Sequence, residues 1–308
     1  MIKVIKPKPL QQGDSVAIIA PASPCDKKLI DKCISSLNEL GLNVVIGESC
    51  ISEHGFLSGT DDIRANDINC MFADKNIKGI FALRGGYGCA RLLDLLDFKL
   101  IKKNPKIFIG YSDITALHIA INQKSKLITY HGPMISTELI KGLDEYSADY
   151  YKKFIFGNEK VEELFNPKGN TLEVINNGIA SGQLIGGNLS LICSSLGTKY
   201  EINTKNKILF LEEVEEVPYK VDRMLTHLKQ SGKLKDVNGI ILGAFTNCIA
   251  PNNKKSLSLQ EVFNEIILPL KKPTISNLVC GHCLPTLTLP LGEKVLLDAN
   301  NKKVKILE

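Results

Sequence analysis

Short apolar runs alternate with longer amphipathic stretches along the first half of the chain. The runs SVAIIAP, NVVIG, GIFALR, KIFIG and LITYHG predict buried strands, and the stretches between them predict helices that begin near Lys27, Asp61, Gly88 and Asp113. Alternation of this kind favours βαβ units and a mainly parallel, doubly wound sheet. In such a sheet, ligands bind beyond the carboxyl ends of the strands.

The pattern fades into polar and turn residues over 158–177, which we interpret as a linker between an N-terminal domain, 1–157, and a C-terminal domain, 178–308. The second half resumes with the apolar runs GQLIGGNLSLI, KILFLEEV and GIILGAF. Helices are predicted over about 219–230 and 259–268, and the chain ends in a β-rich stretch. We therefore expect an α/β protein in which a doubly wound N-terminal domain is followed by a second, β-rich α/β domain.

Composition and charge exclude several classes of protein. A length of 308 residues, 44% hydrophobic and 23% charged residues are typical of a soluble globular protein with room for two domains. The net charge of +5 comes from lysines scattered along the chain, so we expect no nucleic-acid partner. No run approaches 18 apolar residues, and Pro7 and Pro9 interrupt the first apolar stretch, so neither a membrane span nor a signal peptide is expected.

The nine cysteines make an odd count, which suggests reduced thiols and a cytoplasmic location. Cys280 and Cys283 flank His282, but a tetrahedral metal site needs further ligands at suitable spacing, and the sequence offers none there. Buried, small apolar side chains are the favoured interpretation of these thiols. We expect neither a metal nor a cofactor.

The segment LRGGYG, residues 83–88, follows a predicted strand and is rich in glycine. It does not fit a dinucleotide fingerprint, because Arg91 stands where the third glycine belongs, and no Gly-Lys-Ser/Thr follows that would make a Walker loop. A glycine turn can bring backbone N–H groups close to a ligand. Taken alone, the segment favours a plain tight turn between strand and helix.

Ser112 offers a candidate nucleophile, because Gly-Tyr-Ser follows an apolar strand and precedes a predicted helix. This is the strand–turn–helix setting of a nucleophile elbow, although Ile114 replaces the second glycine of G-x-S-x-G. A serine followed by Asp113 at a helix start is also an ordinary helix cap. The segment alone leaves both interpretations open.

A serine nucleophile needs a base and a carboxylate that orients the base. Among the five histidines, His282 lies in a glycine-flanked loop after a buried strand and is the first choice, and His131 at a strand end is the second. His118 is expected to point away from Ser112 along its helix. Glu212 closes an apolar strand at its carboxyl end and is the favoured carboxylate, with Glu213 as its competitor.

Several segments together resemble one family, the LD-carboxypeptidases, which are serine peptidases of murein recycling related to the microcin C immunity peptidases. The matching stretches include KPKPLQQGDSVAIIAPASP, FALRGGYGCARLL, IGYSDITALH, HGPM, GQLIGGNLSLICSSLGT, ILFLEEVEEVPYKVDRMLTHL, GIILGAF and GHCLPTLTLPLGEKVLLD. The resemblance implies two α/β domains. It assigns Ser112 as nucleophile, His282 as base and Glu212 as orienting carboxylate, and it implies an oxyanion hole formed by the backbone N–H groups of Gly86 and Asp113.

The activity that the resemblance implies is metal-independent hydrolysis, through an acyl-enzyme, of the amide bond that holds the terminal D-alanine of a murein tetrapeptide. A homodimer is implied as well. Arg84 beside the glycine turn is a candidate for pairing with a substrate carboxylate, or else a structural ion pair. Two alternatives stay open: an immunity peptidase that acts on aminoacyl-nucleotides, which the lack of Trp disfavours, and a non-catalytic small-molecule binding module of the same fold.

Overall fold

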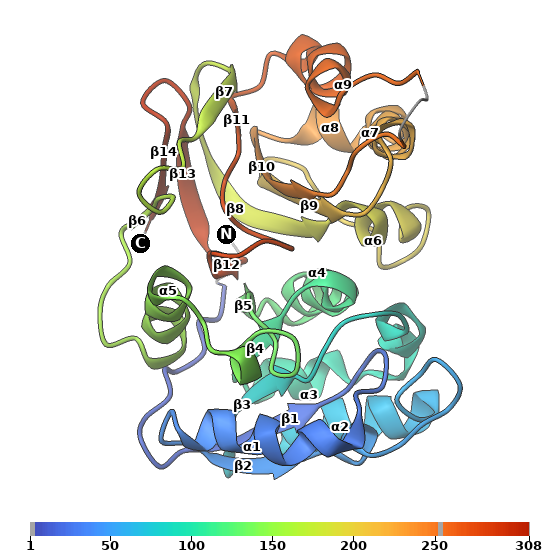
Figure 1. Ribbon diagram of the computed structural model, residues 1–308, viewed down its shortest axis with the longest axis vertical. Coiled ribbons are helices and arrows are strands. Elements are labelled where there is room, and N and C mark those ends of the chain that lie inside the picture. The colour runs from blue at the N-terminus through green and yellow to red at the C-terminus, as the bar shows by residue number, and fades with distance from the viewer. Residues whose placement is uncertain (1–3, 252–254, 308) are drawn as a thin grey trace. The chain divides into compact units, whose positions relative to one another are not determined.

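The five apolar runs of the first half form the parallel part of a six-stranded sheet (Figure 1). Its strands are β1 (Ser15–Ile19), β2 (Asn43–Ile46), β3 (Ile77–Ala82), β4 (Ile107–Gly110), β5 (Thr129–His131) and β12 (Leu289–Leu291). The order is β12-β5-β4-β3-β1-β2, and only β12 runs antiparallel to its neighbour. The strand order reverses at β1, so the crevice at the switch point lies between the carboxyl ends of β1 and β3.

The computed structural model describes residues 4–251 and 255–307. It divides into a first unit, Met1–Lys160 with Thr288–Gly292, and a second unit, Val161–Leu287 with Glu293–Glu308. Residues Thr288–Gly292 belong to the first unit because β12, which they contain, pairs with β5. The doubly wound fold predicted for the N-terminal half is confirmed.

Helices connect the strands of the first unit. They are η1 (Lys27–Leu29), α1 (Ile30–Asn38), η2 (Glu48–Cys50), α2 (Asp61–Ala73), η3 (Cys89–Leu95), α3 (Phe98–Lys103), η4 (Ser112–Ile114), α4 (Thr115–Ser125), η5 (Leu139–Lys141) and α5 (Glu145–Phe156). The helix predicted from Gly88 is a short 3-10 helix instead. Gly88 before it has φ +134° and Leu96 after it is extended, so the segment cannot grow into an α-helix in either direction.

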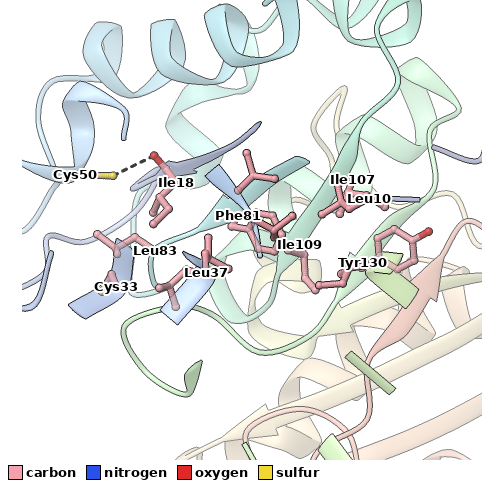
Figure 2. Packing of buried hydrophobic residues seen from close by; sticks show 14 of the residues in the cluster. Leu10, Ile18, Cys33, Leu37, Cys50, Phe81, Leu83, Ile107, Ile109 and Tyr130 are labelled. Atoms are coloured by element: carbon pink, nitrogen blue, oxygen red, sulfur yellow. Dashed lines mark hydrogen bonds between the residues drawn. The ribbon is translucent and has the colours of Figure 1, made fainter. Parts of the chain in front are cut away.

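A single cluster of buried side chains holds this sheet against α1 and α5 (Figure 2). Ile18 from β1, Phe81 from β3 and Ile109 from β4 are each at most 1% exposed, and Leu37 of α1 packs with them. The ends of β1, β3 and β4 are therefore fixed by burial of their own side chains, so the loops that follow them start from rigid positions.

The second unit is built on an eight-stranded sheet in the order β6-β14-β13-β8-β9-β10-β11-β7. Its strands are β6 (Glu163–Leu164), β7 (Glu173–Asn176), β8 (Ile179–Asn188), β9 (Ile208–Val214), β10 (Gly239–Thr246), β11 (Thr274–Ser276), β13 (Lys294–Asp298) and β14 (Lys303–Ile306). Strands β8 to β11 are parallel and the others pair antiparallel. The stretch 158–177, predicted as a linker, supplies β6 and β7 at the two edges of this sheet. The domain limits at 157 and 178 stay a prediction.

Helices α6 (Leu189–Ser194), α7 (Pro218–Gln230), α8 (Lys233–Asp236), α9 (Leu259–Ile266) and η6 (Leu268–Leu270) complete the second unit. The helix predicted from residue 219 begins one residue earlier, because Pro218 suits the first turn of a helix. Within the described part of the chain, no helix has the length and apolar character that crossing a membrane requires.

The core of the first unit contains a buried histidine, His118. Its side chain is fully buried in α4, with Nδ1 2.8 Å from Oγ1 of Thr129 and Nε2 2.8 Å from the carbonyl oxygen of Gly110. A carbonyl can only accept, so the proton sits on Nε2 and Nδ1 accepts from the Thr129 hydroxyl. Burial lowers the pKa of His118 to about 4.

Because the folded pKa lies below the usual value for histidine, the unfolded chain binds the proton first as the pH falls. We expect the free energy of unfolding to lose about 2–3 kcal/mol through this residue between pH 7.5 and pH 4.5. Urea unfolding of His118→Gln at both pH values should show a smaller pH-dependent loss than wild type. His54→Gln, which changes an exposed histidine, should keep the wild-type loss. Equal losses in all three proteins would contradict the assignment.

Candidate active site

Ser112 follows β4 at the carboxyl edge of the first sheet, and its backbone is left-handed, with φ +64°. That region is sparsely populated for residues other than glycine and typically costs on the order of 1–3 kcal/mol. The hydroxyl makes no capping bond: the N-cap positions of η4 and α4 are Tyr111 and Ile114, and neither helix has a side-chain cap. A left-handed serine between a buried strand and a helix is the geometry of a nucleophile elbow.

The glycine turn packs directly against this serine. A Cβ atom at position 85 would lie 2.9 Å from Cβ and 3.1 Å from Oγ of Ser112, so only glycine allows the approach. The next residue, Gly86, has φ +115°, and a Cβ there would collide with Oγ of Ser23. The same Ser23 hydroxyl accepts a hydrogen bond from the backbone N–H of Tyr87 at 3.2 Å. The turn is thus shaped by contacts from the loops after β1 and β4.

Asp113 stands directly after the serine, and its side chain is 1% exposed. Its Oδ2 accepts a hydrogen bond from the backbone N–H of Cys89 at 2.8 Å. The structure therefore brings together, within the first unit, three features that the sequence singled out separately: the serine, the glycine turn and the start of the helix after the serine.

Arg84 begins the glycine turn and is half-buried. Its Nη1 donates to the carbonyl oxygen of Pro24 at 3.2 Å, and the structure records no ion pair for it among the described residues. Of the two roles considered for Arg84, the structural ion pair is therefore not supported.

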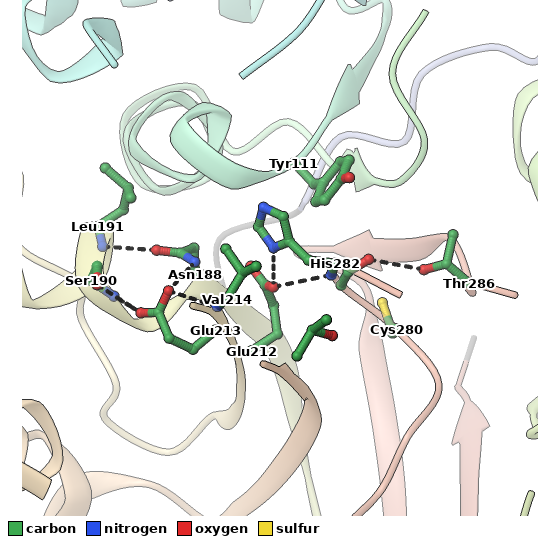
Figure 3. Close-up of polar contacts among 12 residues, drawn as sticks. Tyr111, Asn188, Ser190, Leu191, Glu212, Glu213, Val214, Cys280, His282 and Thr286 are labelled. Atoms are coloured by element: carbon green, nitrogen blue, oxygen red, sulfur yellow. Dashed lines mark hydrogen bonds and ion pairs between the residues drawn. The ribbon is translucent and has the colours of Figure 1, made fainter. Parts of the chain in front are cut away.

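In the second unit, Glu212 and His282 form a direct pair (Figure 3). Nδ1 of His282 lies 2.7 Å from Oε2 of Glu212, and the backbone N–H of His282 donates to the same oxygen at 3.3 Å. Glu212 is completely buried, while 18% of the histidine side chain is exposed. A carboxylate can only accept, so Nδ1 carries the proton, which leaves Nε2 as the nitrogen able to take one.

Gly281 makes this pairing possible. Its φ is +114°, and a Cβ atom there would lie 2.7 Å from Oε2 of Glu212. Any larger residue would push the carboxylate away from the imidazole. Gly281 was not singled out from the sequence, although it directly precedes the candidate base His282.

The neighbouring carboxylate, Glu213, points to the opposite face of β9, as alternation along a strand requires. It is 2% exposed and accepts hydrogen bonds from Nδ2 of Asn188 at 2.9 Å, from the N–H and hydroxyl of Ser190 at 2.8 and 2.7 Å, and from the N–H of Val214 at 2.9 Å. These donors tie the start of α6 to the end of β9. Glu213, the competitor of Glu212, thus has a structural task.

The second-choice base, His131, ends β5 and is 1% exposed. Its ring packs against Tyr111 and His118, at centroid distances of 5.7 and 6.3 Å. These contacts make His131 part of the core of the first unit.

Of the two thiols near His282, Cys280 is buried and Cys283 is half-buried. Sγ of Cys280 donates to the carbonyl oxygen of Leu287 at 3.1 Å, and burial raises the pKa of Cys283 to about 11. Both are therefore protonated near neutral pH, whereas a metal ligand is a thiolate. Across residues 4–251 and 255–307, no group of three or more His, Cys, Asp or Glu side chains is placed to hold a metal ion.

The contrast between the two glutamates gives a stability prediction. Replacing Glu213 with Ala leaves several donors at the β9–α6 junction without their acceptor, so the free energy of unfolding should fall by about 2–4 kcal/mol. Urea unfolding measures this loss. Glu265→Ala, at an exposed position of α9, should change it by less than about 0.5 kcal/mol. A Glu213→Ala protein as stable as this control would contradict the structural role.

The comparison with known sequences covers both units. Residues 16–132 match the LD-carboxypeptidase N-terminal domain, and residues 181–297 match the LD-carboxypeptidase C-terminal domain. A protein of Bacillus subtilis (strain 168), a probable murein peptide carboxypeptidase, is 43% identical over 305 residues, which cover 98% of this chain and 94% of the relative.

Solved structures agree with these matches. An MccF-like protein from Bacillus anthracis strain Ames has 31% identity and a TM-score of 0.88 over 98% of this chain and 99% of that one; MccF is the microcin C7 self-immunity protein. The muramoyltetrapeptide carboxypeptidase from Oxalobacter formigenes has 27% identity and a TM-score of 0.81 over 95% and 97% of the two chains. The domain matches and the identity along nearly the whole length leave one conclusion: the chain belongs to the LD-carboxypeptidase family.

Proposed function

We propose that the protein is a serine carboxypeptidase that releases the terminal D-alanine from murein tetrapeptides during cell-wall recycling. The observation that carries this proposal is the left-handed Ser112, which lies against a glycine turn and makes no capping bond. The names of the Bacillus subtilis and Oxalobacter formigenes relatives support a murein peptide as the substrate.

In the proposed reaction, Oγ of Ser112 attacks the carbonyl carbon of the scissile amide while Nε2 of His282 takes the hydroxyl proton. Glu212 holds the other ring nitrogen, Nδ1, and stabilises the imidazolium that forms. The protonated His282 then gives its proton to the leaving amine of D-alanine. Water, activated by the same imidazole, hydrolyses the acyl-enzyme and regenerates the serine.

The negative oxygen of the tetrahedral intermediate would be bound by the backbone N–H groups of Gly86 and Asp113. Support comes from the position of the turn, since Gly85, one residue before Gly86, touches the serine. Each donor of such a hole contributes about 3 kcal/mol to lowering the barrier. We propose that Arg84 pairs with a carboxylate of the substrate. This residue begins the same turn, and its guanidinium has no acidic partner among the described residues.

We also propose a cytoplasmic location and a homodimeric state. All nine cysteines are free, which supports a reducing compartment. The dimer rests on the family resemblance alone, and sedimentation of the purified protein tests it.

A second candidate function is supported by the similarity to the MccF-like structure. In that case the same serine, histidine and glutamate would hydrolyse an amide bond between an amino acid and a nucleotide-like group. The chain contains no Trp to stack on a base, so we rank this activity below the first.

Ser112→Ala should lower the turnover of a disaccharide-free murein tetrapeptide by about 10³-fold or more, because the acyl-enzyme cannot form. Mass spectrometry of the released D-alanine measures the loss. Ser35→Ala, which removes an exposed hydroxyl of α1, should keep wild-type turnover. Full activity in Ser112→Ala would exclude the serine mechanism.

A comparison of kcat/KM for the two substrates distinguishes the two proposed activities. We expect wild-type protein to hydrolyse the murein tetrapeptide with a kcat/KM at least about tenfold above that for an aminoacyl-nucleotide, because the chain lacks a Trp to stack on the base. A preference for the aminoacyl-nucleotide would favour the immunity enzyme. Binding of either compound without turnover would favour a non-catalytic binding module.

A further inference from the structure

The buried carboxylate of Asp113 has no part in the mechanism described so far. It sits one residue after Ser112, is 1% exposed, and accepts the backbone N–H of Cys89 through Oδ2 at 2.8 Å. A buried carboxylate is costly unless hydrogen bonds and charges compensate it. We therefore consider which segment the Asp113 carboxylate stabilises beside Ser112.

The Asp113 carboxylate binds the backbone N–H of Cys89, the residue that directly follows the glycine turn, and so fixes the C-terminal end of that turn. The near end is fixed where Gly85 packs on Ser112, and the middle is fixed by the hydrogen bond from Tyr87 to Ser23. The turn contains Gly86 at φ +115° and Gly88 at φ +134°. Because glycine adopts positive and negative φ about equally readily, the orientation of the N–H groups between these points depends on the anchors.

Arg64, which is fully buried, lies directly against the turn: a Cβ atom at Gly88 would come within 2.5 Å of its Nη1, and its positive charge acts on Asp113. Nη1 of Arg64 donates to the carbonyl oxygen of Pro21 at 2.6 Å, and its Nη2 pairs with Asp61. Burial raises the pKa of the Asp113 carboxyl, whereas the hydrogen bonds from Cys89, the charge of Arg64 and the amide of Gly88 oppose that rise. Burial is the larger effect, so the pKa of the Asp113 carboxyl is raised on balance; what joins this side chain to the turn is the hydrogen bond from the backbone N–H of Cys89.

We propose that the side chain of Asp113 positions the oxyanion hole by tying the turn that carries Gly86 to the residue whose own N–H is the second donor. This inference rests on the proposed function. One residue then sets both donors: its backbone supplies one N–H, and its carboxylate fixes the segment that supplies the other. An oxyanion hole loses most of its effect when a donor is displaced by a fraction of an ångström to 1 Å, so such a tie affects the rate.

A substrate-independent test uses the rate at which a fluorophosphonate labels the full-length protein, because the tetrahedral phosphonyl adduct on serine places its oxygen in the oxyanion hole. We expect Asp113→Ala to slow labelling by about 10²- to 10³-fold, the effect of losing one donor. Asp113→Asn keeps one acceptor oxygen in the same place and should slow labelling only by about tenfold. With the tetrapeptide, kcat should fall in the same order while KM changes by less than about threefold.

The matched control is Asp67→Asn. Asp67 is another buried aspartate of the first unit, 5% exposed, and it accepts the backbone N–H groups of Glu48 and Ser49 at 3.1 and 2.7 Å. This control should lose stability as Asp113→Asn does and still label at the wild-type rate. If Asp113→Ala does not fold, the labelling rates of Asp113→Asn and Asp67→Asn are compared instead: slower labelling of Asp113→Asn alone supports the positioning role.

The outcomes distinguish the two proposals. If Ser112→Ala is still labelled at the wild-type rate, the serine mechanism itself fails. If labelling requires Ser112 but Asp113→Asn and Asp113→Ala react at the wild-type rate, only the positioning role fails. A reduction in Asp67→Asn equal to that in Asp113→Asn would also overturn it, because the effect would then be a general loss of stability.

Discussion

The left-handed backbone of Ser112 is the constraint on which the rest of the first unit depends. A strained residue of this kind persists only where its surroundings fix both sides of it. Here the strand before it, β4, is buried along its whole length, and the helix after it buries Leu117 and Ala120. Only Tyr111 separates β4 from η4, and burial of these apolar side chains offsets the local strain at Ser112. The hydroxyl is presented at the carboxyl edge of the sheet as a result.

Close approach through glycine recurs in both units. In the first, the missing side chain of Gly85 lets the turn touch Ser112; in the second, the missing side chain of Gly281 lets the loop of His282 fold over Glu212. In both places, a Cβ atom would come within 3 Å of the candidate catalytic side chain. Glycine stands where the backbone approaches each candidate side chain most closely, and positive φ at Gly281 adds to the requirement for glycine.

Much of this could be predicted from the sequence because it follows from local patterns. The helix over about 219–230 and the register that separates Glu212 from Glu213 follow from periodicity and strand alternation. The pairing of β12 with β5 and the contact of Ser23 with the glycine turn could not be predicted, because both join segments more than 60 residues apart. The carboxylate of Asp113 was hidden for a different reason: an aspartate at a helix start looks like part of a cap, whereas here it binds another segment.

The two adjacent glutamates of β9 show how surroundings separate chemically identical groups. Glu213 is surrounded by amide and hydroxyl donors, which take up its lone pairs and make it a structural link. Glu212 has both of its hydrogen bonds from His282 on Oε2, and its other oxygen, Oε1, is buried without a hydrogen-bond partner in the part of the chain that the structure describes. A carboxylate whose charge is not shared among other donors acts more strongly on a neighbouring cation. In the proposed mechanism this favours the imidazolium that forms when the serine attacks, so the scarcity of donors around Glu212 is itself part of the chemistry.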